Sequence, residues 1–212
     1  MVKLSSTEEE NTEFLASLWQ GYKYLLLLIV VMVVGGLVGW EAWNDNRAYK
    51  LQSSSDLYQS FLDSVDDKDL NQAEIAQKIL DNYPNTLYAD LVNFHLVQVN
   101  VEENKLDESE RILKKILEKH SSRWSDDYNP VEATAILRLA RVLIAKGSPL
   151  QAVELIDGYP YINGSLLEVK GDAQVEMNQF SEAKLNYLKA LESTQNTSIK
   201  SLIKMKLADL GE

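Results

Sequence analysis

The apolar positions divide the chain into one continuous apolar run near its start and a series of helical patterns behind it. The run extends from Tyr24 to Trp40, YLLLLIVVMVVGGLVGW, and contains no charged residue; Lys23 precedes it and Glu41 follows it. As an α-helix, its 17 residues would be about 25 Å long, close to the roughly 30 Å hydrocarbon core of a bilayer. The pattern therefore predicts a transmembrane helix, with residues 23–43 as its bounds.

Two other interpretations of the run are a buried core helix and a cleaved signal peptide. A core helix of this length usually has a polar stripe, and the run has none. A signal peptide has a short basic leader and small residues at its cleavage site, but this leader carries Glu8–Glu10, and Trp43 and Asn44 follow the run. An uncleaved membrane anchor is the favoured interpretation.

Gly35 and Gly39 form a G-x-x-x-G pair inside the predicted anchor. Glycines at this spacing lie on one helix face and allow another membrane helix to approach closely, so we consider them candidates for transmembrane packing. Glycine is also frequent in membrane helices that make no such contact, and this alternative stays open. Lys and Arg near the two ends of the run are equal in number, so charge counting leaves the orientation of the anchor open.

Residues 44–212 show helical periodicity almost throughout, and strand-like alternation is hard to find. Apolar residues recur three and four positions apart in segments such as SERILKKIL and ATAILRLARVLIA. Proline and glycine are sparse and fall between such segments, which predicts helix pairs joined by short turns. The predicted fold class is therefore all-α.

Small residues recur at a fixed interval in two of the predicted hairpins. In one hairpin Ala140 precedes Ala152 by 12 positions, and in the other Gly171 precedes Ala183 by the same interval, 31 residues further along. Small residues at these places let two antiparallel helices approach, while larger neighbours fill the space around the contact. The predicted repeat-packing residues are Ala140, Ala152, Gly171, Ala183, Tyr187 and Ala190. The pattern resembles the tetratricopeptide repeat.

Upstream, the hairpin pattern continues but becomes degenerate. Val97 and Ser109 replace one small pair, and Phe61 stands where another small residue is expected. An insertion from Ser121 to Pro130 interrupts the period, and its Trp124 and Tyr128 either fold over neighbouring helices or are exposed and contact a partner.

The last segment, residues 197–212, is expected to form a helix that caps the open end of the array. Its apolar residues are placed near one side of that helix: Ile199, Leu202, Ile203, Met205 and Leu210.

Charge and composition exclude several functional classes. Of 21 basic and 32 acidic residues, two and five lie in residues 1–43, which leaves a net charge of −8 for residues 44–212 and argues against nucleic-acid binding. The absence of cysteine excludes thiol catalysis, disulfides and a lipoprotein anchor. His95 is interpreted as a core or edge residue, and His120 as favourable to the dipole at a helix end. We predict no catalytic, metal or cofactor site.

The complete layout resembles a known family. The anchor running into GWEAWN, the segments LRLARVLIAKGSPLQAVELID and KGDAQVEMNQFSEAKLNY, and the closing KMKLADL are similar to the YfgM family, ancillary subunits of the bacterial SecYEG translocon. The resemblance implies a cytoplasmic leader over residues 1–22, an inner-membrane helix over 23–43 and a periplasmic repeat domain over 44–212. It also implies SecYEG and the chaperone PpiD as partners, with an influence on a stress-response pathway.

Two functional hypotheses follow. One is a non-catalytic scaffold tethered beside the export channel, where a high effective concentration lets weak contacts act. The alternative is a regulatory anchor that binds an envelope stress-response regulator, and the leader of about 20 residues would then be needed for its effect.

Overall fold

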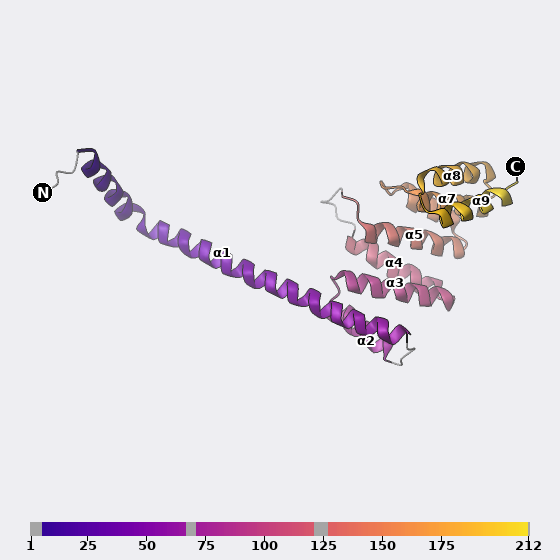
Figure 1. Ribbon diagram of the computed structural model, residues 1–212, viewed down its shortest axis with the longest axis horizontal. Coiled ribbons are helices and arrows are strands. Elements are labelled where there is room, and N and C mark those ends of the chain that lie inside the picture. Colours follow the sequence, from indigo (N-terminus) through magenta and orange to yellow (C-terminus); the bar gives the residue numbers. More distant parts are fainter. Residues whose placement is uncertain (1–5, 67–70, 121–126, 212) are drawn as a thin grey trace. The chain divides into compact units, whose positions relative to one another are not determined.

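The computed structural model describes residues 6–66, 71–120 and 127–211, and the regular secondary structure in these ranges is α-helical throughout. The all-α prediction is confirmed. The helices in the described ranges are α1 (Ser6–Asp66), α2 (Gln72–Asn82), α3 (Leu87–Glu102), α4 (Leu106–His120), α5 (Pro130–Ala145), α6 (Pro149–Asp157), α7 (Gly164–Glu176), α8 (Phe180–Ser193) and α9 (Thr197–Asp209) (Figure 1).

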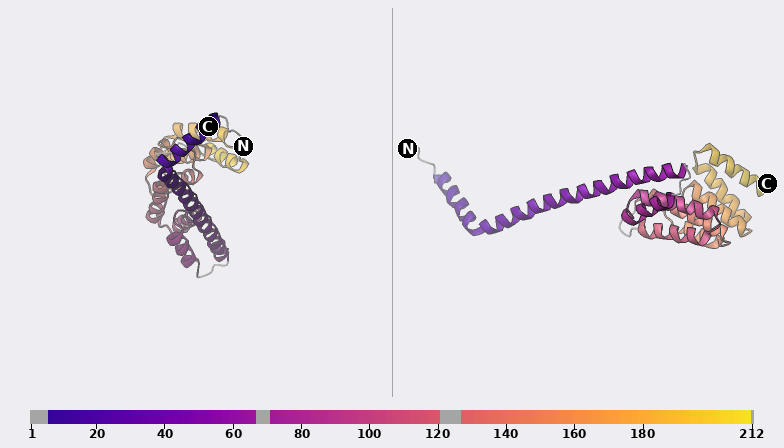
Figure 2. Two further views of the ribbon diagram at one scale, coloured as in Figure 1. Left: turned by 90° about the vertical axis from the view of Figure 1, so that its left-hand side faces the viewer. Right: turned by 90° about the horizontal axis from the view of Figure 1, so that it is seen from below.

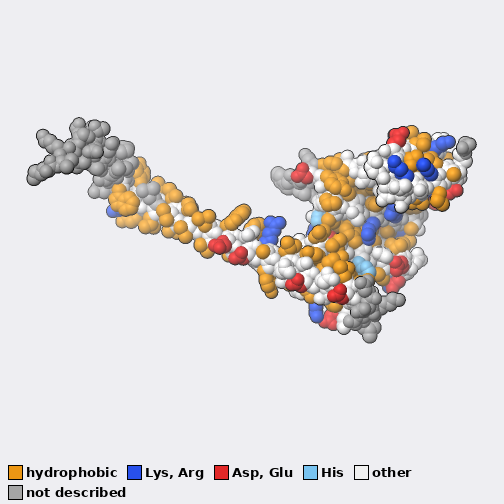
Figure 3. Space-filling model, in the orientation of Figure 1, with side chains coloured by type: hydrophobic (Ala, Val, Ile, Leu, Met, Phe, Trp, Pro, Cys, Tyr) orange, Lys and Arg blue, Asp and Glu red, His pale blue; other side chains and the backbone are white. Residues whose placement is uncertain are grey.

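Internal contacts divide the chain into two units, Met1–Asp56 and Leu57–Glu212. In the first unit, the apolar side chains of α1 that the structure describes, from Trp19 onward, are exposed, and they cover much of the face of this segment that Figure 3 shows. Among the described residues, α1 is the one helix that is long and apolar enough to cross a membrane. Such a helix satisfies its backbone hydrogen bonds internally, as a lipid environment requires.

Helix α1 is longer than the predicted anchor, because it continues without a break to Asp66. Residues 44–66 contain neither proline nor glycine, so nothing in this stretch interrupts the backbone hydrogen bonds of a helix. The last turns of α1, from Leu57 onward, belong to the second unit and supply the first helix of its first hairpin.

Three helix pairs in the second unit, α3–α4, α5–α6 and α7–α8, share one turn geometry. Each turn has three residues, and the middle one has a positive φ: 57° at Asn104, 74° at Gly147 and 60° at Asn178. Glycine and asparagine tolerate this left-handed conformation best. In each turn the next residue donates its N–H to the carbonyl five positions back, which closes the helix end in a Schellman-type turn.

The shared turn geometry shows that the α3–α4 hairpin, whose sequence pattern is degenerate, is also a repeat unit. Asn104 lies seven residues after Val97 and five before Ser109, the same spacing that places Gly147 between Ala140 and Ala152. Val97 and Ser109 are both buried, and the Ser109 hydroxyl donates to the Val97 carbonyl at 3.4 Å. Helices α3 and α4 therefore form a repeat unit whose close contact tolerates a larger residue at the first small position.

Asparagine caps set the starts of α5, α7 and α9. The Asn129 side chain accepts hydrogen bonds from the Val131 and Glu132 amides, and Asn163 and Asn196 cap their helices in the same way. Such caps satisfy amides that have no partner within the helix.

Three apolar clusters run through the second unit, each formed where neighbouring helices pack. The first joins the end of α1 to α2 and α3, the second joins α3 to α7, and the third joins α7, α8 and α9. Figure 1 shows α3, α4 and α5 side by side, and Figure 2 shows α8 next to α9. This serial packing of neighbours is the arrangement of a repeat array.

Helix α9 packs on α8 with one narrow side. Ile203 is fully buried against Ala183, Tyr187 and Ala190. The expectation that Met205 shares this side is wrong, because it is 65% exposed, and Leu202 is 44% exposed. Met205 lies two positions after Ile203 and thus about 200° around the helix.

Candidate partner-binding surface

The predicted repeat-packing residues lie inside the second unit. Ala140 on α5 and Ala152 on α6 are fully buried in the same apolar cluster. On α7 and α8, Ala183 and Ala190 are likewise fully buried, in the cluster that includes Ile203. Close helix contacts of this kind leave no room for added methylenes.

Gly171 and Tyr187 meet directly where α7 crosses α8. A Cβ atom added to Gly171 would lie 2.6 Å from Cδ1 of the Tyr187 ring, so only glycine fits under the ring. The Tyr187 hydroxyl donates to Asp172 at 2.7 Å. Burial, followed by this hydrogen bond, raises the pKa of Tyr187 far above its usual value, so the phenol stays neutral.

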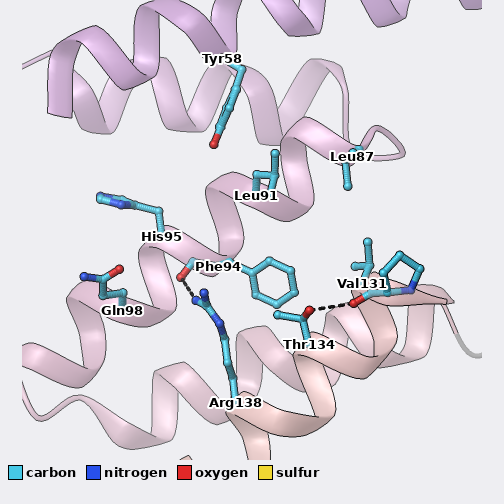
Figure 4. Close-up of a pocket in the computed structure, with 10 residues that line it drawn as sticks. Tyr58, Leu87, Leu91, Phe94, His95, Gln98, Val131, Thr134 and Arg138 are labelled. Carbon is cyan, nitrogen blue, oxygen red and sulfur yellow. Dashed lines mark hydrogen bonds between the residues drawn. The ribbon is translucent and has the colours of Figure 1, made fainter. Parts of the chain in front are cut away.

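Two adjoining hollows lie between α3 and α5. One hollow, of about 430 Å³, is lined from α3 by Leu87, Leu91, Phe94, His95 and Gln98, from α5 by Pro130, Val131, Thr134 and Arg138, and by Tyr58 (Figure 4). A second hollow of about 400 Å³ shares Gln98 and Arg138 with it and continues along Val97, Val101, Leu106 and Val142. We refer to the two together as the α3–α5 groove.

Arg138 stands where the two hollows of the α3–α5 groove join. Its guanidinium lies over the Phe94 ring, 4.8 Å from the centroid, and donates to the Phe94 carbonyl at 2.8 Å (Figure 4). The side chain is half-buried, and burial together with the nearby Arg141 lowers the pKa of Arg138 below its usual value. Sequence reasoning missed this residue, because nothing in the local pattern distinguishes it from a solvated arginine.

An ionic cluster holds α9 against α7. Lys206 of α9 forms ion pairs with the buried Glu168 and with Asp172, whose two carboxylate oxygens lie 2.6 and 2.7 Å from its Nζ. Arg141 of α5 also reaches Glu168, at 3.2 Å. Glu168 and Lys206 are 38 positions apart, so no local sequence signal announces their pairing.

A second polar cluster surrounds Asp90, whose side chain is 2% exposed. Lys119 and His120 both reach this carboxylate at 2.8 Å. Asn129, whose oxygen caps α5, turns its nitrogen to His120 Nδ1 at 3.2 Å, so that Nδ1 accepts and Nε2 donates to Asp90. His120 therefore joins the end of α4 to the start of α5, a role beyond the helix-end interaction that the sequence predicts.

Of the two aromatic residues in the insertion, Trp124 lies outside the described residues. Tyr128 is 54% exposed and meets the edge of the Tyr161 ring, with centroids 5.8 Å apart. It therefore rests on α6–α7 connecting residues on one side and leaves the other side accessible.

The anchor glycines have open surroundings within the first unit. A Cβ atom added to Gly35 or Gly39 would meet nothing within 4 Å. The face that they share can therefore accept another helix. In the described ranges, no three His, Asp or Glu side chains gather as metal ligands would. His95 lies 2.8 Å from the Gln72 side chain and packs against the Phe61 ring.

Comparison with known proteins places this architecture. Residues 17–212 match the tetratricopeptide repeat-like domain family. The ancillary SecYEG translocon subunit of Escherichia coli (strain K12) is 23% identical over 213 residues, which covers 99% of this chain and 100% of the relative. The proteins of the same name from Aggregatibacter actinomycetemcomitans and Neisseria gonorrhoeae (strain ATCC 700825 / FA 1090) are 25% and 23% identical, and each alignment covers 96% of this chain and 97% of the relative.

No solved structure matches the chain. The family match and the relatives agree over nearly the full length, and both include the apolar part of α1. The chain therefore belongs to the tetratricopeptide repeat-like domain family, and the resemblance to the YfgM family is confirmed.

Proposed function

We propose that this chain is a non-catalytic scaffold, tethered to the inner membrane, that associates with the SecYEG translocon and links it to periplasmic chaperones during protein export. The observation that carries the proposal is the joining, in one chain, of an exposed apolar helix to a repeat array with an open groove. The names of the full-length relatives supply the channel as the partner.

The apolar part of α1 acts as the tether. In water its exposed leucine, valine and isoleucine side chains would be costly, whereas in a bilayer they match their surroundings. Association between membrane helices relies on close packing, so the face with Gly35 and Gly39 is the part of the tether that we assign to the channel.

The repeat array acts on the periplasmic side, with the leader of residues 1–22 in the cytoplasm. Charge counting does not decide this orientation, and the resemblance to the family supports it. Residues 44–212 carry a net charge of −8, so anionic lipid head groups repel the array and protein contacts must position it. We assign a membrane-anchored periplasmic chaperone, PpiD in the family, as the partner that the array holds.

Tethering gives the scaffold its effect. A domain fixed within a few nanometres of the channel exit meets emerging chains at an effective concentration of roughly millimolar, at which even weak contacts are occupied. No bond-making step is required of the array, whose task is to raise the local concentration of chaperone at the channel.

Co-purification from gently solubilised membranes tests the proposal. The native chain should purify with the channel and with the chaperone. A matched variant replaces Tyr24 to Trp40 with an unrelated apolar helix of equal length. This variant should no longer purify with the channel but should still purify with the chaperone. If the native chain purifies with neither, the translocon proposal fails.

Recovery of a stress-response regulator in place of the channel would favour the alternative of a regulatory anchor. In that case, deletion of the acidic leader should abolish the effect of the chain while the anchor and array remain intact.

A further inference from the structure

The α3–α5 groove combines an apolar lining with a cation whose charge no carboxylate balances. Within the part of the chain that the structure describes, Arg138 forms no ion pair: its partners are the Phe94 ring and the Phe94 carbonyl. Arg138 lines both hollows, so a ligand in either hollow can reach its remaining guanidinium N–H groups. A half-buried cation of this kind, in a domain that is otherwise acidic, favours an anion.

We propose that the α3–α5 groove binds an extended segment of a partner protein in which one Asp or Glu side chain, paired with Arg138, lies between apolar side chains. This inference rests on the proposed function, in which the repeat array holds a partner, and it adds the site and the chemistry of the segment. The arginine supplies two parallel N–H donors to the carboxylate.

The position of Arg138 indicates that the acidic side chain is internal to the segment and not a chain end. Apolar residues continue on both sides of Arg138: Leu91 and Val131 line one hollow, and Val101 and Val142 line the other. A segment that ended at Arg138 would leave one of these hollows empty. A segment that passes through fills both with apolar side chains.

The groove has the length of a short peptide. From Leu87 to Val101, α3 rises by about 21 Å, which corresponds to roughly six residues of extended chain. The Tyr58 hydroxyl, whose pKa burial raises above its usual value, stays a neutral donor at the first hollow. The ends of such a segment would pass out of the groove along the surface.

The other charged groups near the groove place the carboxylate at Arg138. Arg141 is already paired with Glu168 at 3.2 Å. Glu102, which accepts from Gln98 at 3.1 Å, lies at the far end of the second hollow and would repel an acid there. His95 is paired with Gln72. Arg138 is therefore the cation lining this groove whose charge no carboxylate of the described ranges pairs.

Synthetic peptides test the inference on the full-length chain in lipid nanodiscs. The probe is a fluorescent seven-residue peptide, blocked at both ends, with a central glutamate between leucine and valine residues. Fluorescence anisotropy should give a Kd in the micromolar range, and the matched peptide with a central glutamine should bind at least about tenfold more weakly. A third peptide carries its carboxylate only as a free C-terminus.

Two groove variants and one control separate the site from general charge. Arg138→Gln should raise the Kd of the glutamate peptide at least about tenfold and leave the Kd of the glutamine peptide unchanged. Thr134→Glu, one helical turn before Arg138, places a carboxylate of the chain beside the arginine and should weaken binding of the glutamate peptide as Arg138→Gln does. Arg111→Gln removes the same charge from α4, where Arg111 pairs with the neighbouring Glu108, and should change nothing.

Several outcomes would overturn the inference. These are equal binding of the glutamate and glutamine peptides, equal losses in the Arg138 and Arg111 variants, or tight binding of the free C-terminus peptide alone. If no peptide binds while the chain still purifies with the channel, the inference fails and the proposed function stands. If the glutamate peptide binds through Arg138 but the channel does not purify with the chain, the proposed function fails and the inference about the groove remains supported. Thermal unfolding of each variant verifies that it is folded.

Discussion

The Tyr187 ring of α8 lies directly over Gly171 of α7, so close that a Cβ atom on the glycine would stand 2.6 Å from Cδ1 of the ring. The same tyrosine donates to Asp172, which in turn pairs with Lys206 of the capping helix. The contact between α7 and α8 thus determines where the ring stands, and the ring helps to place the carboxylate that holds α9.

Gly171→Ala should destabilise the chain by roughly 1–3 kcal/mol, because the methyl group forces the Tyr187 ring out of place. Alanine normally stabilises a helix relative to glycine by about 1 kcal/mol, so the expected sign is opposite to the helix propensity. Thermal unfolding of the full-length chain in detergent measures it.

Gly158→Ala is the matched control. Its φ is −74°, and the nearest atom to an added Cβ is the Glu154 carbonyl oxygen at an ordinary 3.4 Å. We expect a change within about 0.5 kcal/mol. Equal effects at the two glycines would show that Tyr187 does not restrict Gly171.

Ala140→Leu and Ala183→Leu should each destabilise the second unit by roughly 1–3 kcal/mol through overpacking. Both alanines are fully buried at helix contacts, whereas Ala208 on α9 is exposed. Ala208→Leu therefore serves as the control, and chemical unfolding distinguishes the three. Unchanged stability in both buried variants would contradict the repeat assignment.

Lys206→Met should loosen the capping helix. It leaves the buried Glu168 with Arg141 alone and removes the charged partner of Asp172, which keeps only the Tyr187 hydroxyl, at a cost of roughly 1–3 kcal/mol. Limited proteolysis should then cut first in α9. Lys204→Met, on the exposed side of α9, should leave the proteolytic pattern unchanged. Identical patterns for the two variants would mean that the ionic cluster does not hold the cap.

Acid should weaken the contact between α4 and α5 through Glu110. Hydrogen bonds from Lys114 and Lys146 hold the pKa of Glu110 below its ordinary value of 4.5. Because the folded-state pKa is lowered, ionised Glu110 stabilises the fold above pH 4.5, and this contribution is lost as the pH falls through the lowered pKa.

Glu110→Gln should therefore be less stable than the native chain at pH 7, and the difference should shrink as the pH falls below about 4.5. Denaturant unfolding at several pH values measures it. Glu74→Gln removes an exposed acid that pairs with Lys78 and should have little effect at any pH. A difference that grows toward acid would reverse the sign assigned to Glu110.

The features that the sequence predicts are those with a local pattern. The anchor is a contiguous run, and the small pairs Ala140–Ala152 and Gly171–Ala183 recur at a constant interval, so both can be read without a structure. The equivalence of the pair Val97 and Ser109 was hidden, because small side chains are not what the α3–α4 hairpin shares with the later two hairpins. The common element is the left-handed turn residue, Asn104, which sequence comparison with Gly147 could have found.

The features that escaped prediction join residues distant in sequence. The pairing of Asp90 with His120 spans 30 positions, and that of Arg138 with the Phe94 carbonyl spans 44. Such contacts depend on how the helices stack, which periodicity within one helix does not encode. Met205 is a different failure, because its place two positions after Ile203 already puts it about 200° around the helix from the buried side.

Site-specific photo-crosslinking in whole cells tests the central claim, association with the export channel, most directly. A photo-crosslinking amino acid at Gly39 reports on the glycine face of α1, and one at Leu37, two positions earlier and about 200° around the helix, reports on the opposite face. The account predicts a crosslink to a channel subunit from Gly39 and a weak or absent one from Leu37. Absence of any channel crosslink from either position, with the chain present in the membrane, would contradict it.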